Sequence, residues 1–313
     1  MKKILCLIVI TVFVAFFASG SALATDWHVP GDFATIQDAI YSPNVVDGDK
    51  IKVGKGSWAG AFVTKAVNIE GSGQAVISSG PLHWSGKVIG FRLLAGSSGA
   101  SISHLKFEGV DFAIMPGPIY LSNISIHHNT FINTVQAVSA WLANGWEISH
   151  NDIIDLRCDN GGGIGILVGD YMGGEVQGNV VSHNNIKGIL HVPSTGEGGG
   201  YSGTGVVLYA DWRYQSAGTA DISSNRVMHN KIELVSDNPS LVDVVAIELT
   251  LAAMPGDYTG PLPMANNIVT HNNITNMGNQ IICTPDELVE ANQIDKNKIK
   301  IGKHPKKQGN PKK

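Results

Sequence analysis

The stretch Val181-Ser182-His183-Asn184-Asn185-Ile186 decides the fold, because the same pattern recurs through the chain. An apolar residue stands three positions before the Asn, another stands two positions after it, and a polar His-Asn pair lies between them. Four further copies begin at Ile126, Ile148, Val227 and Val269, and a segment from Ile102 keeps the His without the Asn. Successive His positions are 24, 22, 33, 46 and 42 residues apart, which indicates a repeat architecture.

Each copy predicts two short strands that meet at a tight bend, with the His-Asn pair at the bend. Asn tolerates the left-handed backbone of such bends, and its amide can bond neighbouring backbone groups, so stacked copies would form an Asn ladder. The spacings of 22 and 24 residues match one turn of a three-stranded parallel solenoid, and the longer spacings match the same turn with inserted loops. No 3.6-residue periodicity runs between the copies, which argues against helical repeats.

Two stretches near the N-terminus add a family resemblance to this repeat. Residues 29–40 (VPGDFATIQDAI) and 47–56 (DGDKIKVGKG) are similar to the N-terminal segments of pectinesterases and NosD-like proteins. With its PbH1-type repeats, the chain resembles the right-handed parallel β-helix proteins of the pectin-lyase-like superfamily over most of residues 27–301. The resemblance implies an all-β solenoid with short capping helices at both ends, the first over residues 34–41. It is specific for architecture, because this superfold hosts lyases, hydrolases, esterases and noncatalytic proteins.

The C-terminal end of the repeat region also carries a cap signal. Thr284-Pro285-Asp286-Glu287 has a capping-box pattern with proline at the first helical position, which predicts a short helix to about Asn292. A last strand is expected over residues 298–301. Caps at both ends would cover the open sheet edges, so we expect a single β-helix domain over residues 25–301.

The two termini predict export and a basic tail. Residues 1–24 have the features of a secretory signal peptide: Lys2 and Lys3, an apolar run and the small-x-small site Ala22-Leu23-Ala24. The mature protein is therefore expected to be secreted or periplasmic, with no membrane span. Residues 302–313 are rich in lysine and are expected to form a disordered basic tail.

Composition and charge narrow the classes of partner. With 37 glycines among 313 residues and 43% hydrophobic residues, the chain is a folded, turn-rich protein rather than a disordered one. Without the signal peptide and the five lysines of the tail, the net charge would be −11. Nucleic acid is therefore a poor partner, and an acidic polysaccharide would need a bridging cation. Cys158 and Cys283 should lie three coils apart, too far for a disulfide.

The predicted substrate face lies on the strands upstream of the His-Asn bends. Period-two alternation over 136–141, 164–169, 205–210 and 245–250 turns one set of residues inward and one set outward. The outward column contains Trp141, Gly169, Tyr209 and Thr250. Long insertions border this strand set on both sides and would wall a groove. In the pectin-lyase-like enzymes that the chain resembles, this face holds the substrate.

Candidate site residues cluster around this face. Asp170, Asp211 and Glu248 would lie on successive coils about 5 Å apart, where they could bind Ca²⁺ or serve as acid and base on a sugar. Arg213 could stabilise a uronate carboxylate or a developing enolate, and these four are the catalytic candidates. Sugar-stacking faces could come from Trp141, Tyr209, Trp212 and Tyr214. The alternatives are separately solvated strand ends, an ordinary surface ion pair and loop packing.

The reaction itself stays open at the level of sequence. The active-site patterns of polygalacturonases, pectate lyases and pectinesterases cannot be placed on this chain. The favoured interpretation is a secreted protein that binds a polysaccharide or surface glycan in a groove on one sheet face, and the sequence leaves open whether it also cleaves the chain as a lyase or glycoside hydrolase. The alternative is a noncatalytic β-helix, including a NosD-like protein that helps assemble a metal site. The column of six His residues could bind metal, or could follow from turn geometry alone.

Overall fold

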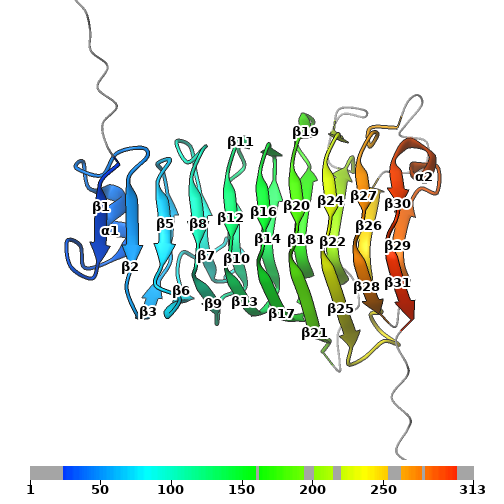
Figure 1. The fold of residues 1–313 in the computed structure, drawn as a ribbon, viewed down its shortest axis with the longest axis horizontal. Coiled ribbons are helices and arrows are strands. Elements are labelled where there is room, and N and C mark those ends of the chain that lie inside the picture. Colours follow the sequence, from blue (N-terminus) through cyan, green and yellow to red (C-terminus); the bar gives the residue numbers. More distant parts are fainter. Residues whose placement is uncertain are drawn as a thin grey trace, which may run out of the picture.

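Three long parallel sheets run side by side along the whole molecule (Figure 1). The computed structural model describes residues 24–159, 162–193, 201–213, 220–252, 262–276 and 279–301. Each coil of the chain contributes one strand to sheet A, the next to sheet B and the next to sheet C, as β12, β13 and β14 do. This is the right-handed parallel β-helix that the repeat predicted. The residues expected to form a signal peptide (1–24) and a basic tail (302–313) lie outside the described residues, apart from Ala24.

Sheets A and B meet at the His-Asn bend. Sheet A has ten strands in the spatial order β1 (Asp26–Val29), β2 (Lys50–Val53), β5 (Asn68–Gly71), β8 (Ser101–Ser103), β12 (Ser125–His127), β16 (Glu147–Ser149), β20 (Val180–Ser182), β24 (Arg226–Met228), β27 (Ile268–Thr270) and β30 (Gln293–Asp295). Sheet B has nine strands in the order β3 (Gly56–Ala59), β6 (Ala75–Ser79), β9 (Lys106–Glu108), β13 (Thr130–Thr134), β17 (Asp152–Arg157), β21 (Asn185–His191), β25 (Lys231–Ser236), β28 (Asn273–Asn276) and β31 (Lys298–Ile301).

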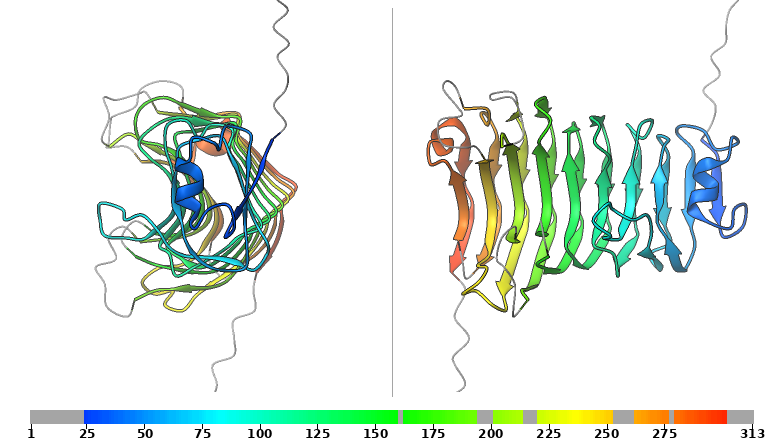
Figure 2. Two further views of the ribbon diagram at one scale, coloured as in Figure 1. Left: turned by 90° about the vertical axis from the view of Figure 1, so that its left-hand side faces the viewer. Right: turned by 180° about the vertical axis from the view of Figure 1, so that it is seen from behind.

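Sheet C closes each coil and holds the longest strands. Its eight strands are β4 (Ala61–Val63), β7 (Ile89–Leu93), β10 (Phe112–Pro116), β14 (Gln136–Trp141), β18 (Gly162–Asp170), β22 (Tyr201–Asp211), β26 (Val245–Ala252) and β29 (Asn279–Thr284). Two short ladders lie between sheets C and A, β11 (Leu121–Ser122) with β15 (Ala143–Asn144) and β19 (Glu175–Gln177) with β23 (Asp221–Ser223). Every pair of these strands is parallel, and the strands wrap around one interior (Figure 2). Inward residues of all three sheets form one apolar core.

The predicted Asn ladder runs along the bend between sheets A and B. Asn184 is buried, donates to the Ile148 carbonyl at 2.8 Å and to the Asn230 side-chain oxygen at 3.0 Å, and accepts from the Asn151 backbone N–H at 3.1 Å. The same bonds repeat at Asn129, Asn151, Asn230 and Asn272, and the ladder continues to Asn297. The five expected asparagines therefore stack, and they satisfy backbone groups that would otherwise be buried without partners.

The left-handed residue of each bend is the His, not the Asn as the sequence suggested. His183 has φ 56°, and the other five His residues of the column have φ between 56° and 58°. Both residue types tolerate this conformation, so the pattern alone could not assign it. Because the His takes the turn, the Asn side chain is free to point into the core and make the ladder.

A second Asn ladder, which the sequence analysis missed, lies five residues before the first. Asn179, Asn225, Asn267 and Asn292 are joined by side-chain hydrogen bonds of 2.8 to 3.1 Å. They line the bend at the start of the sheet A strands. Each coil in this region is therefore held at two of its corners by buried amides.

Helices lie at both ends of the solenoid. Helix α1 (Ile36–Tyr41) begins after Thr35, whose hydroxyl accepts from the Asp38 N–H at 3.0 Å. Helix α2 (Leu288–Ala291) is shorter than expected, and the side chain of its N-cap residue Glu287 makes no capping hydrogen bond. The expected capping box does not form because Thr284 is the last residue of β29 and pairs with Thr250 of β26. Cys158 and Cys283 form no disulfide, as predicted, and both are buried.

Candidate functional site

The outer face of sheet C carries the residues that the sequence placed there. Strand pairing aligns Trp141 with Gly169, Gly169 with Tyr209 and Tyr209 with Thr250, as expected. The inward residues of these strands belong to the main core, whereas the outward Leu167 and Val207 form a separate apolar cluster beneath Trp141 and Tyr209. The period-two assignment is therefore correct for this sheet.

Trp141 lies across Gly169 and reaches the aromatic residues of later coils. A Cβ atom at Gly169 would lie 2.7 Å from Cζ3 of Trp141, so only glycine leaves room for the indole. The Trp141 ring meets Tyr171 at a centroid distance of 5.3 Å and Tyr209 at 5.9 Å, both edge-on. Three half-buried aromatic rings are thereby grouped on one surface, with an apolar floor below them.

A hollow of about 560 Å³ adjoins Trp141 on the N-terminal side. Its floor includes Phe112 and Gln136 of sheet C, and its wall is a small hairpin in which Leu82 pairs with Val88. At the tip of this hairpin Trp84 is 88% exposed. A tryptophan held over a hollow beside a second tryptophan offers two large flat faces to a ligand.

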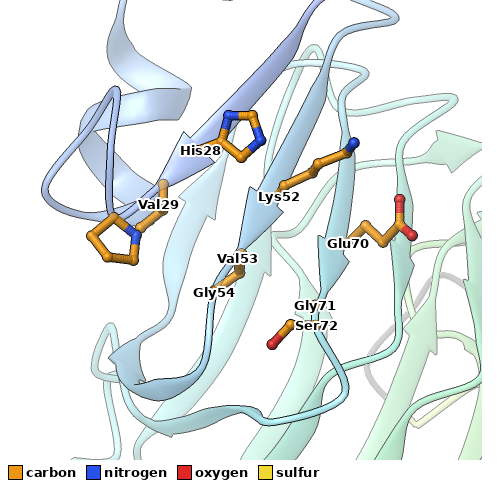
Figure 3. Close-up of a pocket in the computed structure, with 9 residues that line it drawn as sticks. His28, Val29, Lys52, Val53, Gly54, Glu70, Gly71 and Ser72 are labelled. Carbon is orange, nitrogen blue, oxygen red and sulfur yellow. The ribbon is translucent and has the colours of Figure 1, made fainter.

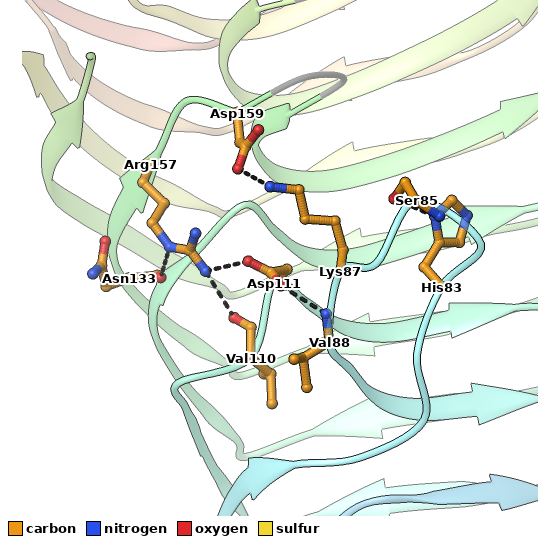
Figure 4. A network of polar contacts seen from close by, with 9 residues as sticks. All are labelled: His83, Ser85, Lys87, Val88, Val110, Asp111, Asn133, Arg157 and Asp159. Carbon is orange, nitrogen blue, oxygen red and sulfur yellow. Dashed lines mark hydrogen bonds and ion pairs between the residues drawn. The ribbon is translucent and has the colours of Figure 1, made fainter. Parts of the chain in front are cut away.

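A polar network anchors this hairpin to the solenoid (Figure 4). Arg157 donates to Asp111 at 2.6 Å and to the Asn133 carbonyl at 2.9 Å, and Asp111 accepts from the Val88 N–H at 2.7 Å. Lys87 of the hairpin forms an ion pair with Asp159, which follows β17. The two ion pairs fix both the base and one side of the hairpin, so the wall of the hollow has a defined position.

His83 and Arg92 add chemistry to the same hollow. Arg92 lies between the buried Phe91 and Leu93 and therefore points outward from β7. Burial in the hollow lowers the pKa of His83, and the charge of Arg92 lowers it further, so the ring is neutral at neutral pH. The Nδ1 atom of His83 lies 2.7 Å from the Ser85 hydroxyl. A neutral imidazole near a guanidinium can act as a base beside a cation.

Asp170, one of the predicted catalytic and metal-binding residues, faces the interior. It aligns with Ala210 of the core rather than with Asp211, so its side chain turns inward at the end of β18. It is fully buried and accepts hydrogen bonds from the backbone N–H groups of Met172 and Gly174, each at 2.7 Å, and from Tyr120. Asp170 therefore holds the turn that follows β18, and we exclude it from the groove.

Asp211 and Arg213 form a pair at the end of β22. The Arg213 guanidinium donates to both oxygens of Asp211, at 3.0 and 2.9 Å, and to the Tyr209 hydroxyl at 2.9 Å. Asp211 is almost fully buried, while Arg213 is exposed. Through the bond from Arg213 to its hydroxyl, the pair holds Tyr209 in position on the outer face.

Glu248 lies on the same outer face one coil further on. It is half-buried and accepts from the hydroxyls of Thr204 at 3.1 Å and Thr250 at 2.5 Å. A carboxyl group has two acceptor oxygens, so Glu248 can accept hydrogen bonds from a ligand as well.

The predicted sugar-stacking residues also fall into two groups, those on the outer face of sheet C and those elsewhere. Trp141 and Tyr209 are on the outer face, but Trp212 is 5% exposed, belongs to the core and donates its indole N–H to the Ala220 carbonyl at 3.1 Å. The expectation for Trp212 is therefore corrected, because Trp212 continues the inward series of Leu208 and Ala210. Tyr214 lies outside the described residues.

The predicted carboxylates do not fit a calcium site. Calcium takes six to eight oxygen ligands, but Asp170 is fully used by the turn and Asp211 lies against a guanidinium that would repel a cation. Over the described ranges, no group of three or more His, Cys, Asp or Glu side chains could hold a metal ion. The same ranges therefore contain no such group for the metal-assembly alternative either.

A second hollow of about 270 Å³ lies at the N-terminal end of sheet A (Figure 3). It is lined by His28, Lys52, Glu70 and the backbone around Gly54 and Gly71. Lys52 is paired with Asp26 at 2.6 Å, and the hollow has half the volume of the first. It has no exposed aromatic residue in its lining, so the hollow beneath Trp84 is the better candidate.

Similarity to known proteins is found among solved structures. Neither a protein-family model nor a curated protein sequence matches the chain. Among solved structures, it is similar to an alginate lyase from Paenibacillus sp. str. FPU-7, with 17% identity and a TM-score of 0.45 over 86% of this chain and 95% of that one.

Two further solved structures are similar at the same level. One is a GH87 alpha-1,3-glucanase catalytic domain in complex with nigerose, with 15% identity and a TM-score of 0.40 over 88% of this chain and 58% of that one. The other is rice weevil pectin methyl esterase, with 10% identity and a TM-score of 0.41 over 89% of each chain. These likenesses concern the fold alone.

Proposed function

We propose that this protein binds a polysaccharide chain along the outer face of sheet C. The observation that carries the proposal is the aromatic surface formed by Trp84, Trp141, Tyr171 and Tyr209 beside a hollow of about 560 Å³. Sugar rings present flat C–H faces that pack on such rings, and their hydroxyls need polar partners nearby. Gln136, Glu248 and Arg213 supply acceptors and donors on or beside this face.

The groove runs across the strands, along the axis of the solenoid. Trp141, Tyr209 and Glu248 come from β14, β22 and β26, so a bound chain would cross several coils at about 5 Å per coil. Trp84 would hold one end of this chain and Arg213 would lie near the other. Such a polymer outside the cytoplasm accords with the signal peptide expected over residues 1–24. Within the described residues, no helix is long and apolar enough to cross a membrane.

Cleavage is the second candidate function, and the hollow favours it more than the predicted carboxylates do. His83 is neutral at neutral pH and Arg92 lies near it, so a β-elimination on a uronate can be written in which His83 takes the proton from the carbon next to the carboxylate and Arg92 stabilises the negative charge that develops there. The carbon–carbon double bond forms as the neighbouring glycosidic C–O bond breaks, and the leaving oxygen takes a proton from water. This assigns a lyase rather than a hydrolase. Its test is the appearance of an unsaturated product that absorbs in the ultraviolet, and its loss in His83→Asn.

The binding proposal is tested by titrating the full chain against a panel of neutral and acidic polysaccharides. We expect Trp84→Ala and Trp141→Ala each to weaken the best ligand by about two- to tenfold, because each removes a stacking face. Tyr41→Ala is the matched control, since Tyr41 is 61% exposed but lies on α1, away from sheet C. Equal affinity for all three variants and the unchanged protein would contradict the proposal.

A further inference from the structure

Six histidines form a continuous row along the bend between sheets A and B. His104, His128, His150, His183, His229 and His271 are all exposed, and neighbouring rings stack with centroids 4.9 to 5.2 Å apart. The first three ring pairs that join these residues are within 5° of parallel. The row is therefore about 25 Å long, with one imidazole edge per coil facing solvent.

Backbone geometry does not explain why these residues are histidines. The bend at the second Asn ladder has the same left-handed residue in each coil, with φ between 57° and 71°. There the positions are occupied by Asn123, Gly145, Gly178, Ser224 and Asn266, and by no histidine. Two corners of one molecule thus meet the same conformational requirement with different residues. What distinguishes the first corner is an imidazole in every coil from His104 to His271.

An imidazole row changes its charge within the physiological pH range. Imidazole in general gains a proton between about pH 8 and pH 5, so a surface row of imidazoles can gain positive charge as the pH falls. Partial burial lowers the pKa of His128 and His183, and the charges of neighbouring rings in the row lower it further. His127 and His128 approach to 3.0 Å between their Nδ1 atoms, so both cannot carry a proton there at once. Full protonation is therefore opposed by the row itself.

The surroundings of the row have no dominant charge of their own. On the sheet A strands, the charged neighbours are Glu147, Arg226 and Asp295, and the ring of His127 lies beside the row. On the sheet B strands, the charged residues two positions after the bend are Lys106, Asp152, Lys231 and Lys298, of which Lys106 and Lys231 pair with Glu108 and Glu233. Lys296 takes the bend position after His271. The charge of this surface is therefore set mainly by the histidines.

We propose that the histidine row is a second binding site, which takes up a linear acidic polysaccharide when its imidazoles are protonated. A polymer with regularly spaced carboxylates or sulfates can pair with successive rings, whereas the parallel rings do not converge on one small anion. Nucleic acid is disfavoured because the ring faces are used in stacking on each other and only edges remain for a ligand. This site is separate from the sheet C groove and does not depend on the function proposed for it.

The test measures binding of the full chain to immobilised polygalacturonate at about pH 5 and about pH 8, with dextran as the neutral control. We expect binding at the lower pH that weakens by about tenfold or more at the higher pH, with proton uptake on binding. The triple variant His128→Asn, His150→Asn, His183→Asn should lose this pH dependence. Asn occupies the same backbone conformation at Asn123 and Asn266, so the variant should fold. The single variant His150→Asn should show an intermediate loss.

Two comparisons separate this site from others. Trp84→Ala should leave the pH-dependent component unchanged, because Trp84 belongs to the sheet C groove. Binding that is equal at the two pH values, or that persists in the triple variant, would overturn the proposal. A single-stranded oligonucleotide that binds with the same pH dependence while polygalacturonate does not would also overturn it.

Discussion

Gly169→Ala tests whether the position of Trp141 determines glycan binding. The new Cβ atom would lie 2.7 Å from Cζ3 and 2.9 Å from Cε3 of the indole, and 2.9 Å from the Tyr209 carbonyl oxygen. Ordinary contacts of this kind are about 3.5–4.0 Å, so the ring must retreat by roughly 1 Å. Gly169 does not have a positive φ, so alanine can adopt its backbone conformation and the contact is the main effect.

We expect Gly169→Ala to lower both the stability of the protein and its affinity for glycan. Forcing a methyl group into this contact should lower the free energy of unfolding by about 1–3 kcal/mol, which urea denaturation measures. Moving the ring away from Tyr171 and Tyr209 should weaken glycan binding by about two- to tenfold, because one stacking face is displaced. Isothermal titration with the best glycan measures the second effect.

The decisive control is the double variant Gly169→Ala, Trp141→Ala. Without the indole, the added methyl group meets only the backbone of β22, so it should have little further effect on affinity. If Gly169→Ala weakens binding equally with and without Trp141, a shift of the strands rather than of the ring is the cause, and the reasoning is refuted.

Three other outcomes follow from the structure. Asn184→Leu should lower the free energy of unfolding, measured by urea denaturation, by about 2–6 kcal/mol, because the Ile148 carbonyl and the Asn151 N–H lose their partners. Asn297→Leu, at the less buried end of the ladder, should lower it by less. Arg157→Leu should lower the free energy of unfolding by about 1–3 kcal/mol and also weaken glycan binding, because the Leu82–Val88 hairpin loses its anchor. Unchanged glycan affinity would show that the hairpin is not part of the groove. Burial raises the pKa of Cys158 to about 11 and that of Cys283 above its usual value, so both stay thiols at neutral pH and a thiol reagent should label them only after unfolding, as mass spectrometry can show.

The repeat predicted the fold because it encodes local and long-range structure together. Each copy specifies a strand, a bend and a second strand. Because an Asn recurs at the same place in each copy, as at Asn151, Asn184 and Asn230, the repeat also determines which residues meet on neighbouring coils. The exact residue that takes the left-handed conformation was not predictable, because His and Asn both tolerate it. The second ladder, through Asn179, escaped notice because its flanking residues vary more from coil to coil.

The site was predictable where alternation was followed to the end of each strand. Trp141 and Tyr209 lie within strands, so alternation placed them correctly on the outer face. Asp170 and Trp212 stand two residues after the inward Val168 and Ala210, so alternation also directs them inward, and their assignment to the groove did not follow it. Trp84 was missed because its hairpin is an insertion in a coil that has no His-Asn copy. A Trp within a short stretch rich in Gly and Ser was the available signal.

The measurement that tests the central claim most directly is a crystal structure of the full chain with an oligosaccharide of the best-binding glycan. The account predicts sugar rings packed against Trp84 and Trp141 and extending over Tyr209 along the outer face of sheet C. Sugar bound instead in the hollow beside Lys52, or a fully bound oligosaccharide that makes no contact with sheet C, would contradict it.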